Sequence, residues 1–302
     1  MALLYIIKIN SPRFFIILLT ACCILLPVPS DAAVQWSLSA VTGYYLPRLK
    51  ELNYVLNNNK VELGPFNADA KPAPYPVIYE GFNPGMPDMR PMAPKFGLQL
   101  QADISPRYAI VFGNSEGVLD STKRDVRSFF VGFPIPSNRE TRFALSLNQF
   151  WLGVKRYWLW GEKTGEKSTA PRRFYTEVGV LAVTKAYLTT DVFLHVYSPE
   201  EGFDFYKVAE TESKGNGYAT YLGVGGEYYI MKWLSVGLDI DYVAGGVSKI
   251  KFVRYFTVDP LEKDIIKPGD KVNYTDFSRG LILPLFIDLE GLDFKGQLRF
   301  YF

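Results

Sequence analysis

The chain has 302 residues, of which 48% are hydrophobic and 21% are charged, and this balance excludes a disordered chain. The formal net charge of +2 provides no strongly basic surface, so we expect no nucleic-acid partner. A single histidine, His195, leaves little room for a histidine-based metal site or catalytic triad. We therefore expect neither a metal ion nor another cofactor.

The beginning of the chain has the pattern of an export signal. Lys8 and Arg13 precede the apolar run 14–26, and small residues follow this run. Cleavage at the small residues makes 1–32 a signal peptide and leaves 33–302 as the mature protein. An uncleaved membrane anchor is the alternative, but the apolar run is short for a membrane-spanning helix.

The two cysteines allow a second interpretation of this segment. Residues 19–22 (LTAC) resemble a bacterial lipobox, which predicts acylation of Cys22 as the alternative to cleavage after Ala32. Under ordinary cleavage Cys22 and Cys23 both leave with the signal. The mature chain then contains no cysteine, which excludes disulfide bonds and thiol chemistry.

Most of the mature chain consists of stretches of roughly ten residues in which apolar and polar residues alternate, as in transmembrane β-strands. The pattern is clear in 95–105, where Leu98 and Leu100 alternate with Gln99 and Gln101. No later segment is long and apolar enough for a transmembrane helix. We predict ten strands, at 34–46, 95–105, 107–117, 141–148, 150–160, 172–183, 186–196, 217–230, 232–246 and about 279–302.

An eight-stranded barrel is the main alternative. In that arrangement 141–160 and 172–196 each form one continuous strand. Ten is preferred over eight because 141–160 is long for one strand and polar residues in the middle of both segments favour turns there.

The connectors between the predicted strands alternate in length. Short turns are expected near Pro106, Asn148, Lys185 and Met231. Long connectors are expected at 47–94, 118–139, 161–171, 197–217 and 248–277. This alternation predicts short periplasmic turns and long extracellular loops. A soluble β-sandwich is the less favoured alternative, because it has no reason to sort its loops in this way.

The first of the long connectors, 47–94, has two parts. Within 47–59 the spacing of Leu49, Leu52 and Val55 predicts a short amphipathic helix. The rest is rich in proline, which cannot occupy a central strand. The loop could form an extracellular cap, a plug or simply a solvated loop.

The last predicted strand contains a change of phase. Leucine and isoleucine residues alternate on odd positions from Leu281 to Leu289, and apolar residues alternate on even positions from Leu292 to Phe302. One extra residue in a β-bulge near Glu290 would explain the change and keep ten strands. A tight hairpin there would give eleven strands.

These features together resemble bacterial outer-membrane β-barrel proteins, in the group of small barrels that includes OmpA-like and OmpW-like folds. The resemblance is carried by the signal peptide, the alternating strands and the final segment 294–302 (FKGQLRFYF). It implies an all-β, antiparallel, up-and-down transmembrane β-barrel in the bacterial outer membrane. It also implies that Phe300, Tyr301 and Phe302 form a signal for the barrel-assembly machinery, and that outer-membrane lipid and lipopolysaccharide are partners.

In such a barrel the polar face of each strand lines the lumen. Eight to ten strands enclose side chains rather than a wide channel, so these charges are expected to pair with one another and fill the interior. A selectivity filter or proton pathway is the alternative. The predicted lumen charge cluster is Asp103, Lys155, Glu177, Glu227, Asp239, Asp241, Lys295 and Arg299.

Tryptophans near the predicted strand ends suggest an aromatic girdle at the membrane surface, as in other transmembrane barrels. Its predicted members are Trp151, Trp158, Trp160 and Trp233.

The expected function is a structural or surface-interaction role for a barrel with a charged, largely filled lumen. A narrow channel for small or amphipathic solutes is the alternative. No enzymatic activity is expected. The remote exception is a lipid-modifying enzyme that uses His195, which has Asp191 on the same strand face and Ser198 nearby.

Overall fold

The computed structural model describes residues 34–57, 61–64, 90–91, 95–125, 137–158, 172–198, 202–257, 266–276 and 280–302. The predicted signal peptide, Cys22 and most of the first loop lie outside the described residues.

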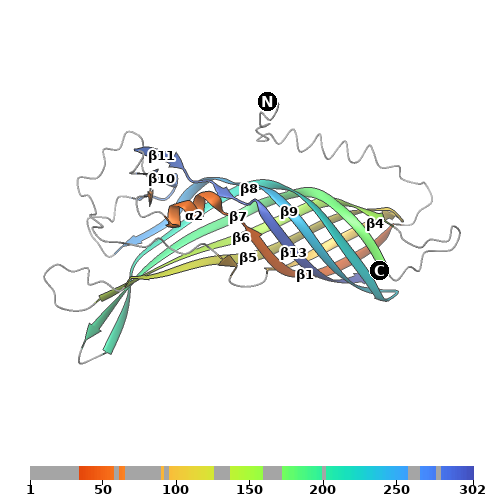
Figure 1. Ribbon diagram of the computed structural model, residues 1–302, viewed down its shortest axis with the longest axis horizontal. Helices are drawn as coiled ribbons and strands as arrows, with labels where there is room; N and C mark the ends of the chain where they lie inside the picture. The colour runs from red at the N-terminus through yellow and green to blue at the C-terminus, as the bar shows by residue number, and fades with distance from the viewer. Residues whose placement is uncertain are drawn as a thin grey trace.

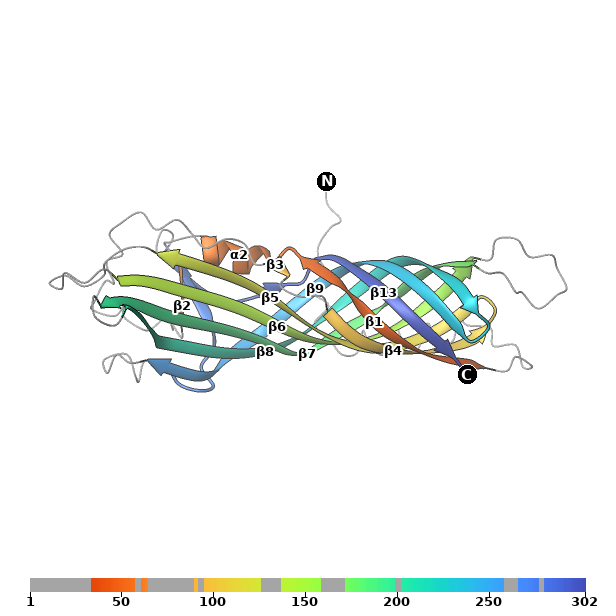
Figure 2. The same ribbon diagram turned by 90° about the horizontal axis from the view of Figure 1, so that it is seen from below.

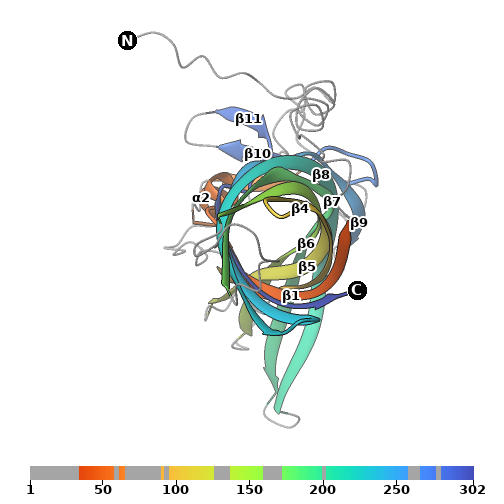
Figure 3. The same cartoon turned by 90° about the vertical axis from the view of Figure 1, so that its right-hand side faces the viewer.

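The main sheet closes into a ring of eight antiparallel strands (Figures 1 and 3). Each strand pairs with the next one along the chain, and the last returns to pair with the first, as Ser37 opposite Tyr301 shows. Closure leaves no free edge in the ring. The ring strands are β1 (Gln35–Pro47), β4 (Lys95–Ser105), β5 (Tyr108–Asp125), β6 (Ser137–Trp158), β7 (Arg172–Ser198), β8 (Gly202–Met231), β9 (Leu234–Thr257) and β13 (Gly291–Tyr301).

Smaller elements surround this ring. Two short strands extend the main sheet, β3 (Arg90–Pro91) beside β5 and β12 (Ile287–Asp288) beside β9. A separate three-stranded sheet and one helix complete the described part: β2 (Val61–Gly64), β10 (Asn273–Asp276), β11 (Leu281–Pro284) and α2 (Lys50–Asn57). None of the described helical structure is both long and apolar enough to cross a membrane.

The ring has eight strands, not the predicted ten, because two predicted strand pairs are each continuous. The segment 141–160 runs through β6 as far as Trp158, and 172–196 lies within β7. The polar residues interpreted as turns, Asn148 and Lys185, instead lie at shifts in the register between neighbouring strands. A β-bulge adds an extra residue to a strand without reversing the chain. Polar residues at such a bulge therefore give the same sequence pattern as a turn.

The short and long connectors are not divided between the two ends of the ring as predicted. We call the end of the ring with the tight turns at 106–107 and 232–233 the turn end, and the opposite end the extended end. The connector 159–171 also joins its strands at the turn end. At the extended end β7 passes to β8 within 199–201, so most of the predicted long loop 197–217 is strand.

The ring strands differ greatly in length. β1, β4 and β13 have 11 to 13 residues, whereas β7 has 27 and β8 has 30. β5 to β9 therefore continue well beyond the point where the short strands stop (Figure 2). Helix α2 lies at that point and packs against β12 (Figures 1 and 2).

The outside of the turn-end half is apolar. We define the apolar belt as the exposed large apolar side chains of the ring strands in this half. Leu98, Leu222 and Leu238 are 55%, 62% and 72% exposed. On β13 the belt runs from Leu292 to Phe302, where ten steps of about 3.3 Å, tilted by about 40°, give about 25 Å along the axis. This height is typical of the lipid-facing band of a transmembrane barrel.

The interior changes from polar to apolar along the barrel axis. In the turn-end half many inward positions carry charged, amide and hydroxyl side chains. In the extended half the inward positions form an apolar cluster that spans many strands. Its members there include Leu145, Leu188, Val247, Ile250, Leu285, Ile287 and Leu289.

Helix α2 supplies part of this apolar interior, and it lies inside the predicted helical segment 47–59. Leu49 and Leu52 are fully buried in the same cluster as Leu289. The Glu51 carboxylate accepts a hydrogen bond from the Phe286 backbone N–H at 3.2 Å, and partial burial raises the pKa of this carboxyl. The helix thus covers the interior where the short strands end.

The change of phase in the last strand is not the predicted bulge. Ile287 opposite Val247 and Gly291 opposite Val243 follow one uninterrupted register. Odd-numbered residues face inward on both sides of Glu290. The sequence pattern reverses because the interior itself changes from apolar to charged, while the backbone continues without an extra residue.

We predict that Leu52→Ala destabilises the fold by about 2–5 kcal/mol, because it leaves a cavity in the apolar interior. Urea unfolding of the refolded protein, followed by tryptophan fluorescence, measures this change. The matched control is Leu281→Ala, at a side chain that is 46% exposed, which should cost under about 1 kcal/mol. Equal losses in the two variants would contradict the placement of α2.

Candidate functional site: the charged barrel interior

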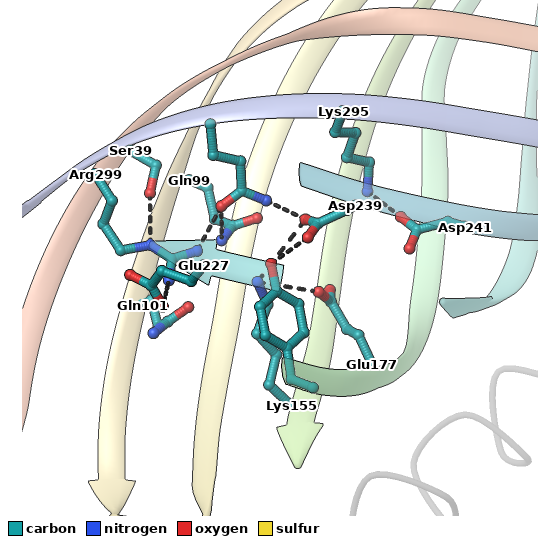
Figure 4. Close-up of polar contacts among 12 residues, drawn as sticks. Ser39, Gln99, Gln101, Lys155, Glu177, Glu227, Asp239, Asp241, Lys295 and Arg299 are labelled. Atoms are coloured by element: carbon teal, nitrogen blue, oxygen red, sulfur yellow. Dashed lines mark hydrogen bonds and ion pairs between the residues drawn. The ribbon is translucent and has the colours of Figure 1, made fainter. Parts of the chain in front are cut away.

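The strands of the turn-end half direct every second side chain inward, and these positions hold the predicted lumen charges. All eight predicted residues are buried, with exposed fractions of 7% or less. Figure 4 shows seven of them converging from several strands. The eight are Asp103, Lys155, Glu177, Glu227, Asp239, Asp241, Lys295 and Arg299.

The layer nearest the turn end is built on Arg299 and Glu227. Arg299 Nη1 lies 2.9 Å from Glu227 Oε2, and Arg299 Nε donates to Ser39 Oγ at 3.0 Å. The hydroxyls of Tyr301 and Ser235 donate to Glu227 Oε1. These residues come from β13, β8, β1 and β9, so one buried ion pair links four strands of the ring.

A second layer surrounds Lys155. Its Nζ lies 3.4 Å from Glu177 Oε2 and 3.8 Å from Asp239 Oδ2, and it stands 4.0 Å from the centroid of the Tyr175 ring. Tyr221 donates to Glu177 Oε1 at 2.6 Å, and Tyr175 donates to Asp239. The lysine is thus shared by two carboxylates whose remaining oxygens are held by tyrosines.

The third layer borders the apolar half and contains two charges that the prediction missed. Lys295 forms an ion pair with Asp241 and lies 3.8 Å from Asp293 Oδ2. Asp293 in turn forms an ion pair with Lys95. The alternation of the strands already indicates that both residues face inward. Lys95 is an even number of residues from Gln99 on β4, and Asp293 is an even number of residues from Lys295 on β13.

Asp103 lies apart from these three layers. Its Oδ2 is 3.3 Å from Arg173 Nη1, and its Oδ1 accepts a hydrogen bond from Gln101 Nε2 at 2.6 Å. Gln101 Nε2 also donates to Tyr157 at 2.7 Å. Arg173 is absent from the predicted cluster. It is the second residue of β7 and follows a long connector, so in the sequence it resembles a charged loop residue.

Trp151 is not a girdle residue, contrary to the prediction. It is 2% exposed and faces inward, because it shares the parity of Lys155 on β6. Lys295 Nζ lies 4.8 Å from the centroid of its ring. A Cβ at Gly113 would lie 2.3 Å from Trp151 Cζ2, so a glycine is required in the facing wall.

The other predicted aromatic residues occupy different positions. Trp158 and Trp233 are about half-exposed at the turn end, and Trp160 lies outside the described residues. Phe300 and Phe302 are 41% and 74% exposed on the belt. Of the predicted assembly signal, Tyr301 instead faces the interior, where it donates to Glu227.

His195 belongs to β7, where its backbone is opposite Asn138 and Phe205. Its side chain lies outside the described part of the structure, and so does that of Ser198. The predicted arrangement with Asp191 therefore stays a prediction.

The polar side chains leave little open space within the described interior. A pocket lined by residues such as Tyr45, Lys95 and Gln149 has about 20 Å³, which is room for about one water molecule. No three histidine, cysteine, aspartate or glutamate residues of the described chain are placed to hold a metal ion. The arrangement pairs charges across the barrel and presents no described cleft to a substrate.

Charged side chains at the extended end are also paired, but they are only partly buried. Lys207 Nζ lies 2.8 Å from Asp191 Oδ1 and 2.9 Å from Glu210 Oε2. The hydrogen bond from Lys207 lowers the pKa of Glu210. On this side of the molecule acidic and basic groups are therefore mixed.

Comparisons with known proteins give little further guidance. No family model and no curated protein matches the chain. Among solved structures it is similar to the crystal structure of the outer membrane protease OmpT from Escherichia coli, with 8% sequence identity and a TM-score of 0.22. The match covers 89% of this chain and 96% of that one.

This comparison corrects one prediction. The sequence predicts a barrel without enzymatic activity, but the matched barrel is an outer membrane protease, so this prediction is withdrawn. At a TM-score of 0.22 the likeness carries no argument for a protease activity in this chain.

We predict that Arg299→Met destabilises the barrel by about 3–5 kcal/mol, because Glu227 would remain buried without its cationic partner. The double variant Arg299→Met with Glu227→Gln should recover part of this loss, since it buries no unpaired charge. Urea unfolding in lipid vesicles measures both variants, with Lys185→Gln as the control at an exposed cation. A double variant that is less stable than Arg299→Met alone would contradict the pairing.

Proposed function

We propose that this chain is an integral β-barrel protein of the bacterial outer membrane with a closed, non-conducting interior, and that it has a structural or surface-interaction role. The observation that carries the proposal is the network of buried ion pairs across the turn-end half. The apolar belt supports the membrane location, because exposed apolar side chains occur on all eight ring strands. The predicted export signal and the resemblance to outer-membrane barrels support the same compartment.

A filled interior opposes transport for a physical reason. An ion or solute on the barrel axis would have to separate Arg299 from Glu227 and Lys295 from Asp241. Separating buried, hydrogen-bonded charges leaves each with an uncompensated desolvation cost of several kcal/mol. Beyond these layers it would meet the apolar interior that Leu52 and Leu289 help to fill.

The extended end supports the surface role. β5 to β9 continue past the apolar belt, so they would stand outside the bilayer when the belt is inserted. In the orientation we propose, the turn end faces the periplasm and the extended end faces the exterior. Outer-membrane lipid and lipopolysaccharide would contact the belt, and the barrel-assembly machinery would engage β13.

We predict that the refolded protein shows no single-channel conductance in planar bilayers, because the ion pairs block the axis. A conducting porin inserted into the same bilayers is the positive control. Heat-modifiable mobility on a gel reports that the protein tested is folded. Steady conductance by the unchanged protein would overturn the closed interior and favour the narrow-channel alternative.

The membrane location has its own test. The refolded protein should insert into lipid vesicles, resist extraction by carbonate and migrate differently before and after boiling. A protein that stays in the aqueous fraction after correct folding would contradict the outer-membrane proposal.

A further inference from the structure

Four exposed cations border the apolar belt at the turn end. Arg107 lies in the turn between β4 and β5, and Lys232 lies in the turn between β8 and β9. Arg156 is near the end of β6, and Arg172 is the first residue of β7. All four side chains are exposed. We call these four residues the basic arc.

The register of the strands brings the arc to one rim of the barrel. Arg156 is opposite Tyr108, which directly follows Arg107. Arg172 is opposite Tyr228, at the end of β8 that leads into the turn with Lys232. The cations therefore follow the rim from the β4–β5 turn to the β8–β9 turn.

The arc has no exposed acidic counterpart in the described part of the turn end. The acids closest to it along the strands, Asp103 and Glu227, are buried and paired with Arg173 and Arg299. At the extended end, by contrast, Lys207 and the exposed Arg254 lie beside carboxylates. The described surface of the turn end leaves the four cations of the arc without an exposed carboxylate beside them.

Aromatic rings accompany the arc at the edge of the belt. The Arg156 guanidinium lies 4.3 Å from the centroid of the Trp158 ring, and that of Arg172 lies 5.9 Å from the Tyr228 ring. Trp233, beside Lys232, is 51% exposed. Amphipathic rings next to cations are suited to the headgroup level of a bilayer, where one end of the ring is apolar and the other is hydrated.

We propose that the basic arc binds the phosphate groups of anionic phospholipids in the leaflet at the turn end. This inference rests on the membrane insertion proposed above. The guanidinium groups can hold a phosphate through two parallel hydrogen bonds, and Lys232 adds a point charge. The acyl chains of the same lipid would lie on the adjacent apolar belt, which a free phosphate ion cannot use. The chemistry of the rim therefore favours a phospholipid over inorganic phosphate.

The test uses the full refolded chain in neutral detergent, titrated with phosphatidylglycerol or with phosphatidylcholine of the same acyl chains and followed by native mass spectrometry. We expect the unchanged protein to prefer phosphatidylglycerol by at least about tenfold, since each cation near an anionic headgroup contributes about fivefold in affinity. The variant Arg107→Gln, Arg156→Gln, Arg172→Gln and Lys232→Gln should lose this preference. The variant Arg107→Lys, Arg156→Lys and Arg172→Lys, which keeps the positive charges, should keep most of this preference.

The matched control removes four exposed lysines elsewhere, through Lys185→Gln, Lys214→Gln, Lys249→Gln and Lys251→Gln, and should retain the preference. An equal loss of the phosphatidylglycerol preference in this control would show that net charge alone sets the preference, and would overturn the arc as a binding site. Displacement of the lipid by millimolar inorganic phosphate would overturn the choice of a phospholipid. Equal affinity for both lipids in a protein that inserts and shows heat-modifiable mobility would overturn this inference alone, whereas failure to insert would overturn the proposed function.

Discussion

The interior of an eight-stranded ring is only wide enough for the side chains that line it, so inward residues have to satisfy one another across the barrel. In the turn-end half these residues are charged, and burial makes every unpaired charge costly. Arg299, Lys155 and Lys295 accordingly each lie close to one or two carboxylates from other strands of the ring. The tyrosines and amides occupy many of the remaining hydrogen-bonding positions. Strand closure and charge pairing thus depend on each other.

The barrel combines two kinds of interior within one set of strands. Around the belt the outside is apolar and the inside is polar, whereas in the extended half the apolar side chains face inward. The unbroken register of β12 and β13 against β9 shows that a single backbone serves both environments. Helix α2 is needed only in the extended half, because β1, β4 and β13 stop before the apolar interior is covered.

Several mistaken predictions share one physical cause. The same local sequence pattern is compatible with a turn, a bulge or a change in the face that a side chain occupies. The pairing with neighbouring strands decides which of these structures forms. Asn148 and Lys185 resemble turn residues in the sequence, yet each lies beside a register shift. Trp151 resembles a membrane-surface residue from its place near a strand end, but it has the parity of Lys155 and faces inward. Lys95 and Asp293 have the parity of the inward charges, and the structure places both among them.

The sequence by itself determined the alternation of the strands, the set of eight buried charges and the short helix within 47–59. These follow from local periodicity, since side chains two residues apart in a strand share a face. Only the tertiary structure decided the strand number, the partner of each charge and the absence of a bulge at Glu290. Those properties depend on the register between strands far apart in the chain, and register is set by cross-strand hydrogen bonds and packing that no single segment contains.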